Sequence, residues 1–286
     1  IATTDRNAGI PDAVKNLTKT FEYNDIDGLK AMFERYKDKV AAVIMEPVIA
    51  EKPEDGYLQK VKDLTHENGS LLIFDEMISG FRFAMGGIQE YLGVTPDLAT
   101  FGKGITNGMP LGVLAGKKEY MKEFDKVFLS STYAPEALTL AAASANIDFY
   151  KKNNVIDELW NKGEYIEDGF NSVIDKYSIR KNMSLAGYPV RLMVNSHDNN
   201  GVQDSKLATL YQQEMFRHGM LCFSGVLMLS YSHSKEDLDL LIDAFDKTCK
   251  VIKGYLESGK SIDSYLHGIP GEPVFKGLRE RNAVSN

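Results

Sequence analysis

The sequence has little cysteine, no long apolar run and no excess of positive charge. Its two cysteines, Cys222 and Cys249, form no C-x-x-C pair and cannot build a disulfide framework, so we expect a reducing, cytoplasmic location. No stretch approaches the roughly 18 apolar residues of a membrane span, and the first residues lack a signal-peptide pattern. Lys and Arg number 33 against 40 Asp and Glu, a net charge of −7, which argues against binding to nucleic acid or anionic membranes.

The remaining composition is that of a globular protein with small-molecule ligands. Hydrophobic residues make up 43% and charged residues 26% of the 286 positions, which is enough chain for one large domain or two ordinary ones. The five histidines show no ligand spacing to one another, so we expect no metal site.

Short apolar runs alternate with a helical pattern in the first half of the chain. Four such runs predict buried strands, at residues 40–46, 70–75, 97–101 and 111–115, and the first of them is expected to be covered on both faces. The apolar spacing of residues 56–68 predicts a helix between the first two. This order indicates an α/β fold with a mainly parallel sheet, in which ligands bind at the carboxyl ends of the strands.

The second half of the chain has a different pattern of apolar residues. We expect two successive helices, at 134–150 and 155–177, and then an α+β unit with strands near 190–194 and 220–231 and helices near 206–218 and 235–255. A polar break at residues 151–154 separates the two helices. The sequence therefore predicts a large domain over residues 1–152, followed by a linker helix and a small C-terminal domain over 153–286.

Lys103 stands between two glycines directly after a predicted buried strand, in the text Phe-Gly-Lys-Gly. Gly102 and Gly104 permit positive φ and a close approach of ligand. A partly desolvated lysine has a lowered pKa, which prepares its amine to form a Schiff base. The alternative is a glycine-rich turn that carries an exposed lysine.

Asp75 ends another predicted strand, at 70–75. A buried carboxylate needs a cation, and the protonated ring nitrogen of pyridoxal phosphate is such a cation. The alternative is a structural pair between Asp75 and Arg82 across the next turn.

Taken together, these motifs resemble a known family. Asp-Glu-x-x-x-Gly-Phe-Arg at 75–82, Phe-Gly-Lys-Gly at 101–104 and Ser-Thr-Tyr at 131–133 are similar to the class III aminotransferases of pyridoxal phosphate fold type I. The branch that contains glutamate-1-semialdehyde 2,1-aminomutase is the most similar. The resemblance implies pyridoxal 5'-phosphate as cofactor, with a large domain and a smaller C-terminal α+β domain.

The resemblance also implies roles for particular residues. Lys103 matches the lysine that holds the cofactor as an internal aldimine and shuttles a proton, and Asp75 matches the partner of the pyridinium nitrogen. Met77 stands where the family usually packs a valine on the cofactor ring. Thr132 matches the residue that reaches the cofactor phosphate of the neighbouring subunit, which implies a homodimer with shared active sites; an ordinary helix N-cap is its alternative role. Glu51 occupies the register of a glutamate near the substrate, although it also fits an exposed loop beside Lys52.

The function that the resemblance implies is transfer of an amino group from a small amino donor to a carbonyl acceptor. Around Lys103 and Thr132 the sequence differs from the motifs of the aminomutases, which favours an aminotransferase with another substrate. Intramolecular amine transfer is the nearest alternative. The family's N-terminal phosphate-binding loop has no counterpart in residues 1–286. We therefore expect the chain to lack the family's N-terminal part, and an inactive structural or interaction fragment is the alternative from another class.

Overall fold

The computed structural model describes residues 7–130, 132–133, 136–223 and 225–271. Its first half is built on a four-stranded sheet in the order β1-β2-β3-β4. The first three strands are parallel and the last runs antiparallel to β3: Ala42–Met45, Leu71–Asp75, Leu98–Phe101 and Val113–Gly116. All four lie where the apolar runs predict strands. The sheet is therefore mainly parallel, as expected.

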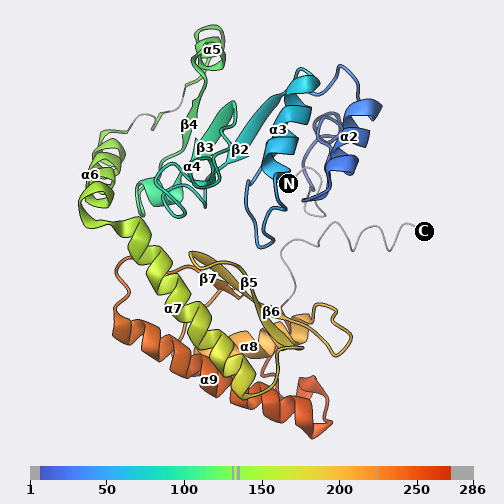
Figure 1. Cartoon of the computed structure of the whole chain (residues 1–286), viewed down its shortest axis with the longest axis vertical. Coiled ribbons are helices and arrows are strands. Elements are labelled where there is room, and N and C mark those ends of the chain that lie inside the picture. Colours follow the sequence, from blue (N-terminus) through green and yellow to red (C-terminus); the bar gives the residue numbers. More distant parts are fainter. Residues whose placement is uncertain (1–6, 131, 134–135, 224, 272–286) are drawn as a thin grey trace.

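Helices α2 and α3 lie together beside this sheet (Figure 1). Helix α3, Tyr57–Glu67, connects β1 to β2 and buries Leu58 and Val61 at helical spacing. Helix α2, Ile26–Arg35, packs on α3 and was not expected from the sequence. The remaining helical segments of this half are short: α1 (Asp12–Lys15), α4 (Ile88–Tyr91), η1 (Lys103–Ile105), α5 (Lys118–Met121) and η2 (Lys122–Lys126).

Strand β1 is buried on one face only, which corrects the expectation that both faces are covered. Val43 is 6% exposed and contributes to the core, whereas Ile44, the next residue, is 61% exposed. Successive side chains of a strand point to opposite faces, so a continuous apolar run does not by itself show that both faces are covered.

The buried carboxylate of Asp97 holds the end of the sheet opposite to the carboxyl ends of β2 and β3. Asp97, which precedes β3, accepts a hydrogen bond from the backbone N–H of Leu72 at 2.8 Å. Its carboxylate also lies 2.6 Å from Lys117 Nζ and 2.8 Å from His66 Nε2. These contacts tie β2, β3, α3 and the end of β4 together.

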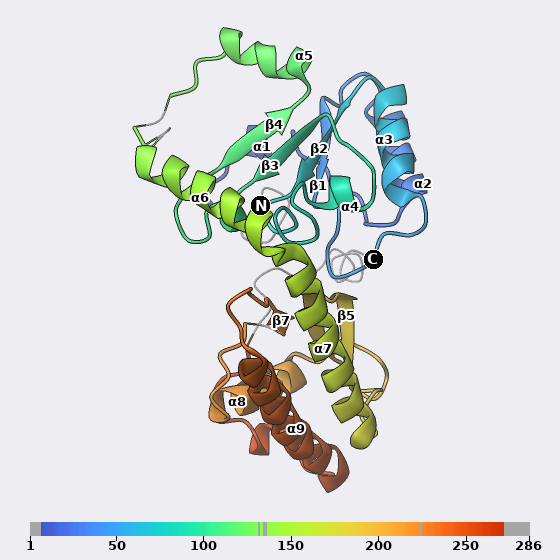
Figure 2. The ribbon, with the colours of Figure 1, turned by 60° about the vertical axis from the view of Figure 1, so that its left-hand side comes forward.

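Two long helices lead from the first half into the second. Helix α6, Ala137–Asn153, is followed directly by α7, Val155–Lys176, which runs along the second sheet (Figure 2). The second sheet is antiparallel in the order β5-β6-β7: Met183–Tyr188, Arg191–Ser196 and Val226–Leu227. The structure completes this half with α8 (Ser205–Arg217), α9 (Lys235–Ser258) and η3 (Ile262–Ser264).

The buried apolar residues form two cores. The first includes residues of α2, α3, β1 and β2 together with Val155, Leu159 and Val190. The second lies between β5–β6 and helices α7, α8 and α9, with Phe170 stacked on Phe245 at 3.8 Å between ring centroids. Helix α7 thus contributes its first turns to one core and its later turns to the other. The division at residues 152 and 153 stays a prediction.

None of the helices in the described part of the chain is both long and apolar enough to cross a membrane.

Candidate active site

Asp75 and Lys103 follow two neighbouring parallel strands at the same edge of the first sheet. Asp75 is the last residue of β2 and stands opposite Thr100 of β3. Lys103 comes two residues after the end of β3. The carboxyl ends of parallel strands share one edge, so the fold brings the carboxylate and the amine to the edge where ligands bind in α/β proteins.

The carboxylate of Asp75 is held by local hydrogen bonds. Oδ1 accepts from the backbone N–H of Met77 at 3.0 Å and from the hydroxyl of Thr100 at 3.3 Å. Among the described residues no hydrogen bond reaches Oδ2. The alternative pairing with Arg82 is wrong, because the Nη1 of Arg82 donates instead to two backbone carbonyl oxygens far along the chain.

The turn at Lys103 is strained, and its glycines serve close packing. Lys103 has φ of 46°, a left-handed value that costs a residue with a side chain about 1–3 kcal/mol. Gly102 has φ of −173°, which any residue adopts, but a Cβ there would lie 2.5 Å from Met77 Sδ and 3.1 Å from Leu111 O. The expectation that Gly102 and Gly104 supply positive φ is therefore wrong; the lysine itself takes it.

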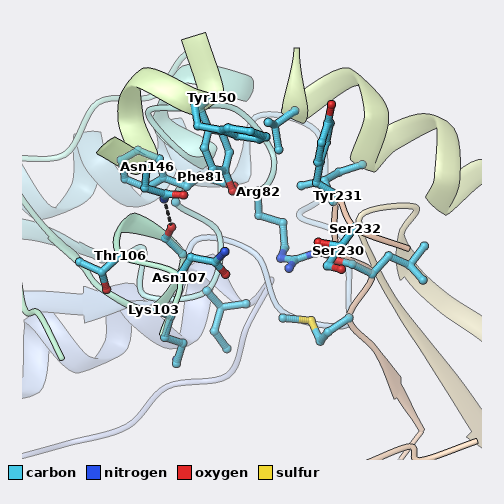
Figure 3. A pocket seen from close by; sticks show the side chains of 18 of the residues that line it. Phe81, Arg82, Lys103, Thr106, Asn107, Asn146, Tyr150, Ser230, Tyr231 and Ser232 are labelled. Carbon is cyan, nitrogen blue, oxygen red and sulfur yellow. Dashed lines mark hydrogen bonds between the residues drawn. The ribbon is translucent and has the colours of Figure 1, made fainter. Parts of the chain in front are cut away.

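The side chain of Lys103 is exposed, which corrects the expectation that burial prepares its amine. The turn is nevertheless firmly placed. Asn146 of α6 donates from Nδ2 to Gly104 O at 2.8 Å and to Ile105 O at 3.0 Å (Figure 3). Sequence reasoning missed Asn146, because it stands about 40 residues away in a helix with no motif of its own.

Glu76 anchors the loop that follows Asp75. Its fully buried carboxylate accepts hydrogen bonds from the backbone N–H groups of Ile88 and Gln89, both at 3.0 Å, and from the hydroxyl of Ser79. Gly87 leaves room for this carboxylate, because a Cβ there would lie 2.3 Å from Glu76 Oε2. The loop from 77 to 87 is thus closed at its base by a buried anion.

Aromatic side chains from the long helices hold the same loop from outside. Tyr150 of α6 donates to Phe81 O and Trp160 of α7 donates to Phe83 O, each at 3.0 Å. Phe81 has φ of 60°, so the loop and the Lys103 turn each carry a strained residue that has a side chain. Strained residues of this kind concentrate at functional sites.

A cavity of about 510 Å³ lies beside the lysine turn. Lys103, Thr106 and Asn107 line one side of it, and Ser230, Tyr231 and Ser232 line the other, with Arg82 between them (Figure 3). Met77 also lines this cavity. Asp75, Thr132 and Glu51 do not, so the structure brings two of the five predicted site residues to the cavity itself and a third to the neighbouring strand end.

The other two predicted residues stand in exposed segments. Thr132 lies in an exposed turn before α6, and the N-cap of that helix is Glu136, whose carboxylate accepts from the N–H groups of Leu138 and Thr139. The alternative role of Thr132 as an N-cap is therefore wrong, and the helix begins at 137 rather than 134. Glu51 lies in an exposed loop, where its Oε1 accepts from Asn24 Nδ2 at 3.1 Å.

The described residues contain no group of three or more His, Cys, Asp or Glu side chains that could hold a metal ion.

Comparison with known proteins gives a consistent result. The family model described as Aminotransferase class-III matches residues 4–248. Glutamate-1-semialdehyde 2,1-aminomutase of Methanosphaera stadtmanae is 36% identical over 257 residues, which cover 83% of this chain and 60% of that protein. The 3-aminobutyryl-CoA aminotransferase of Cloacimonas acidaminovorans is 34% identical over 258 residues, which cover 87% and 61%.

Solved structures show the same fold. The PLP internal aldimine form of the FumI protein of Sphingopyxis sp. MTA144 matches with a TM-score of 0.81 at 20% identity, over 91% of this chain and 63% of that one. An omega-transaminase from Sphaerobacter thermophilus matches with a TM-score of 0.75 at 26% identity, over 85% and 59%. The expected fold class, that of the fold type I enzymes, is confirmed.

This chain spans about 60% of the length of the two curated relatives. The motifs around Asp75 and Lys103 stand at adjacent strand ends of a fold shared with solved transaminases, and the family model covers most of the sequence. The chain belongs to the class III aminotransferases.

Proposed function

We propose that this chain carries the catalytic residues of a pyridoxal-phosphate-dependent aminotransferase, which moves an amino group from a small amino donor to a carbonyl acceptor. The observation that carries the proposal is the position of Asp75 and Lys103 at the carboxyl ends of two adjacent parallel strands. The pyridine ring of this cofactor requires a carboxylate at one end and an amine at the other. The edge of the sheet at which β2 and β3 end carries both groups.

The residues present fit the cofactor. Bound pyridoxal phosphate supplies an electron sink for the substrate carbon that carries the amine. Oδ2 of Asp75, which accepts no hydrogen bond from the described residues, would hold the proton on the ring nitrogen. Nζ of Lys103 would form the covalent bond to the cofactor and move the proton at the substrate carbon. The thioether of Met77, which packs against Gly102 between these two residues, would contact the ring.

The active enzyme is a homodimer in this proposal, with Thr132 serving the cofactor phosphate of the neighbouring subunit. Its support is the apolar surface around Thr132: Phe128 is 95%, Leu129 74% and Tyr133 82% exposed. An exposed run of this kind is typical of a protein interface. A two-fold interface would complete both sites at once.

Two weaker parts of the proposal concern the substrate and the location. Glu51 would act at the rim of the substrate site, a role that requires it to leave Asn24. The cytoplasm is the proposed location, because Cys222 and Cys249 are both free.

Absorbance spectroscopy tests the proposal directly. Pyridoxal phosphate added to the full chain should give the visible band of a lysine-bound cofactor, and the band should be absent from Lys103→Ala. Lys118→Ala, which removes an exposed lysine of α5, is the matched control and should keep the band. A wild-type chain without the band would favour an inert subunit, and a band that survives in Lys103→Ala would assign the cofactor to another amine.

Intramolecular amine transfer is the second candidate, and the 36% identity to an aminomutase favours it. The two activities differ in their need for a second substrate. An aminotransferase stops after one half-reaction unless an oxo acid is supplied, whereas a mutase needs none. Turnover of glutamate-1-semialdehyde without added oxo acid would therefore replace the leading proposal.

A further inference from the structure

Helix α6 buries few of its own side chains. Two of the 17 residues in Ala137–Asn153 are buried, Thr139 and Ala143. The helix packs against α7, which follows it, and against η1, the short helix that begins at Lys103. Most helices are held in place by a buried apolar face. Because α6 has so little of one, its polar contacts contribute more to its placement.

The side-chain amide of Asn146 reaches from α6 to the lysine turn (Figure 3). Its Nδ2 donates to Gly104 O at 2.8 Å and to Ile105 O at 3.0 Å. An amide nitrogen carries two hydrogens, so one is available for each carbonyl oxygen. The contact depends on these donors and not on shape alone, because a carboxylate of the same shape would place its own oxygens against the two carbonyl oxygens.

The turn that Asn146 contacts contains a strained residue. Lys103 has φ of 46°, a left-handed value that a residue with a side chain keeps only where surrounding contacts hold it. The backbone hydrogen bonds of the turn are local. Ile105 N–H donates to Gly102 O at 3.2 Å, and Asn107 N–H donates to Lys103 O at 3.0 Å. Asn146 instead joins the turn to a helix that is 41 and 42 positions away along the chain.

Tyr150 makes the same kind of contact one helical turn further along α6. Its hydroxyl donates to Phe81 O at 3.0 Å, and its ring meets that of Phe81 edge-on at 5.8 Å between centroids. Phe81 has φ of 60°, so it is strained as well. The two strained segments touch at Gly104, where a Cβ would lie 3.4 Å from Phe81 Cβ. Residues four apart lie on the same face of a helix, so one face of α6 contacts both segments.

We propose that Asn146 is a positioning residue for Lys103, with Tyr150 as a second contact of the same helix face. The two hydrogen bonds keep the lysine turn in its left-handed conformation. They thereby fix the direction in which the Lys103 side chain leaves the backbone, next to the strand that ends at Asp75. Without them, Lys103 is expected to relax toward negative φ, which turns its side chain away from that direction. The catalytic consequence rests on the proposed function, whereas the effect on the turn does not.

Hydrogen exchange of the cofactor-free chain, followed by mass spectrometry, tests the turn. Asn146→Asp keeps the shape of the side chain and, at about pH 8, replaces both donors by acceptor oxygens. The amides of residues 105–107 should then exchange at least about fivefold faster, because the turn opens more often. Exchange in β2 and β3 should stay within about twofold of the wild type.

Asn153→Asp is the matched control for Asn146→Asp. It makes the same change of charge on the same helix, where Asn153 Nδ2 donates to Phe149 O at 2.8 Å, one turn back along α6. This bond does not reach the lysine turn. Exchange at residues 105–107 should therefore stay within about twofold of the wild type in the control.

A second variant leaves Asn146 in place and tests the other contact of the helix face. Tyr150→Phe removes one hydroxyl and keeps the ring beside Phe81. The amides of residues 82–83, which are hydrogen-bonded within the adjoining turn, should exchange about fivefold faster, and residues 105–107 should change less.

Each variant can overturn the proposal. Unchanged exchange at residues 105–107 in Asn146→Asp, or an equal rise in β2 and β3, would show that Asn146 does not hold the turn. If Asn146→Asp does not fold, Tyr150→Phe decides: faster exchange at residues 82–83 supports the role of the helix face, and unchanged exchange refutes it.

Steady-state kinetics of the cofactor-loaded enzyme test the catalytic consequence. Asn146→Asp should lower kcat about 10- to 100-fold, because a displacement of about 1 Å can cost about 100-fold in rate. KM should change by less than about threefold, whereas the loss of a substrate contact would raise KM at constant kcat and overturn the positioning role. If the wild-type chain shows no visible band with pyridoxal phosphate, the proposed aminotransferase function fails. Hydrogen exchange then still decides whether Asn146 holds the turn.

Discussion

Replacement of Glu76 is expected to destabilise the loop beside the active site in two graded steps. The carboxylate is fully buried and accepts from the N–H groups of Ile88 and Gln89, each at 3.0 Å. Glu76→Ala leaves both N–H groups without an acceptor. Each buried unsatisfied donor costs about 1–3 kcal/mol, and release of the buried charge offsets part of this cost. We expect the free energy of unfolding to fall by about 3 kcal/mol in total.

Glu76→Gln should lower the free energy of unfolding by roughly half as much as Glu76→Ala. Whichever way the amide is turned, its nitrogen faces one of the two N–H groups, so one donor loses its acceptor and the other keeps it. Glu90→Ala, in the short helix α4 that follows the loop, is the matched control. Glu90 is exposed and accepts from the N–H of Gly86 at 2.7 Å, and its loss should cost about 0.5 kcal/mol or less.

The single tryptophan makes this loop observable. Trp160 donates to Phe83 O at 3.0 Å, and Phe83 lies between Glu76 and Ile88. Urea unfolding followed by Trp160 fluorescence and by far-UV circular dichroism therefore reports the loop and the whole chain together. The expected order of midpoints is wild type, Glu90→Ala, Glu76→Gln and Glu76→Ala, from highest to lowest. Equal midpoints for Glu76→Ala and Glu90→Ala would refute the buried-anion argument.

Asp75→Asn should slow amino transfer by several orders of magnitude, on the order of 3–5 kcal/mol, while cofactor retention measured by absorbance changes little. A fall of less than tenfold in steady-state rate would assign Asp75 another role. Burial raises the pKa of Asp97, but Lys117, the Leu72 N–H and His66 together lower it by more. The net direction is downward, so the carboxylate stabilises the fold above its ordinary pKa. Urea midpoints of wild type and Asp97→Asn should therefore differ most near pH 7 and converge below about pH 3, and a constant difference would contradict this. Thr132→Val and Lys103→Ala, each inactive alone, should restore activity when mixed, because one site of the heterodimer receives neither defect; a fully active monomer in light scattering would remove the shared-site proposal.

The sequence predicted the strands of the first sheet well, because each is a short continuous apolar run. Strand β5, Met183–Tyr188, was missed for a physical reason. Its sequence contains Ser184 and Gly187, and its apolar and polar residues do not alternate clearly. The strand therefore depends on pairing with β6 rather than on its own pattern. The strand expected over 220–231 is only Val226–Leu227 in the structure, where it pairs with two residues of β6.

The candidate site was predictable where chemistry is local and unpredictable where partners are distant. Asp75 and Lys103 were found from motifs next to strand ends. Arg82 was considered only as the alternative partner of Asp75, but its acceptors are 108 and 147 residues away, at Val190 and Leu229. Only the tertiary fold brings such groups together, so a sequence without aligned homologues carries no signal for them.

The reversal of β4 has a consequence for divergence among related enzymes. Phe101 pairs with Val113, so the connection that carries Lys103 leaves and re-enters the sheet at neighbouring positions. Asn107 and Gly108, midway along it, are exposed; a Cβ at Gly108 would meet nothing within 4 Å, but the φ of 121° there disfavours any residue with a side chain. Insertions can accumulate there while both ends stay clamped by the same two strands. Natural variation can therefore reshape the rim of the site, and with it the choice of substrate, without displacing the amine.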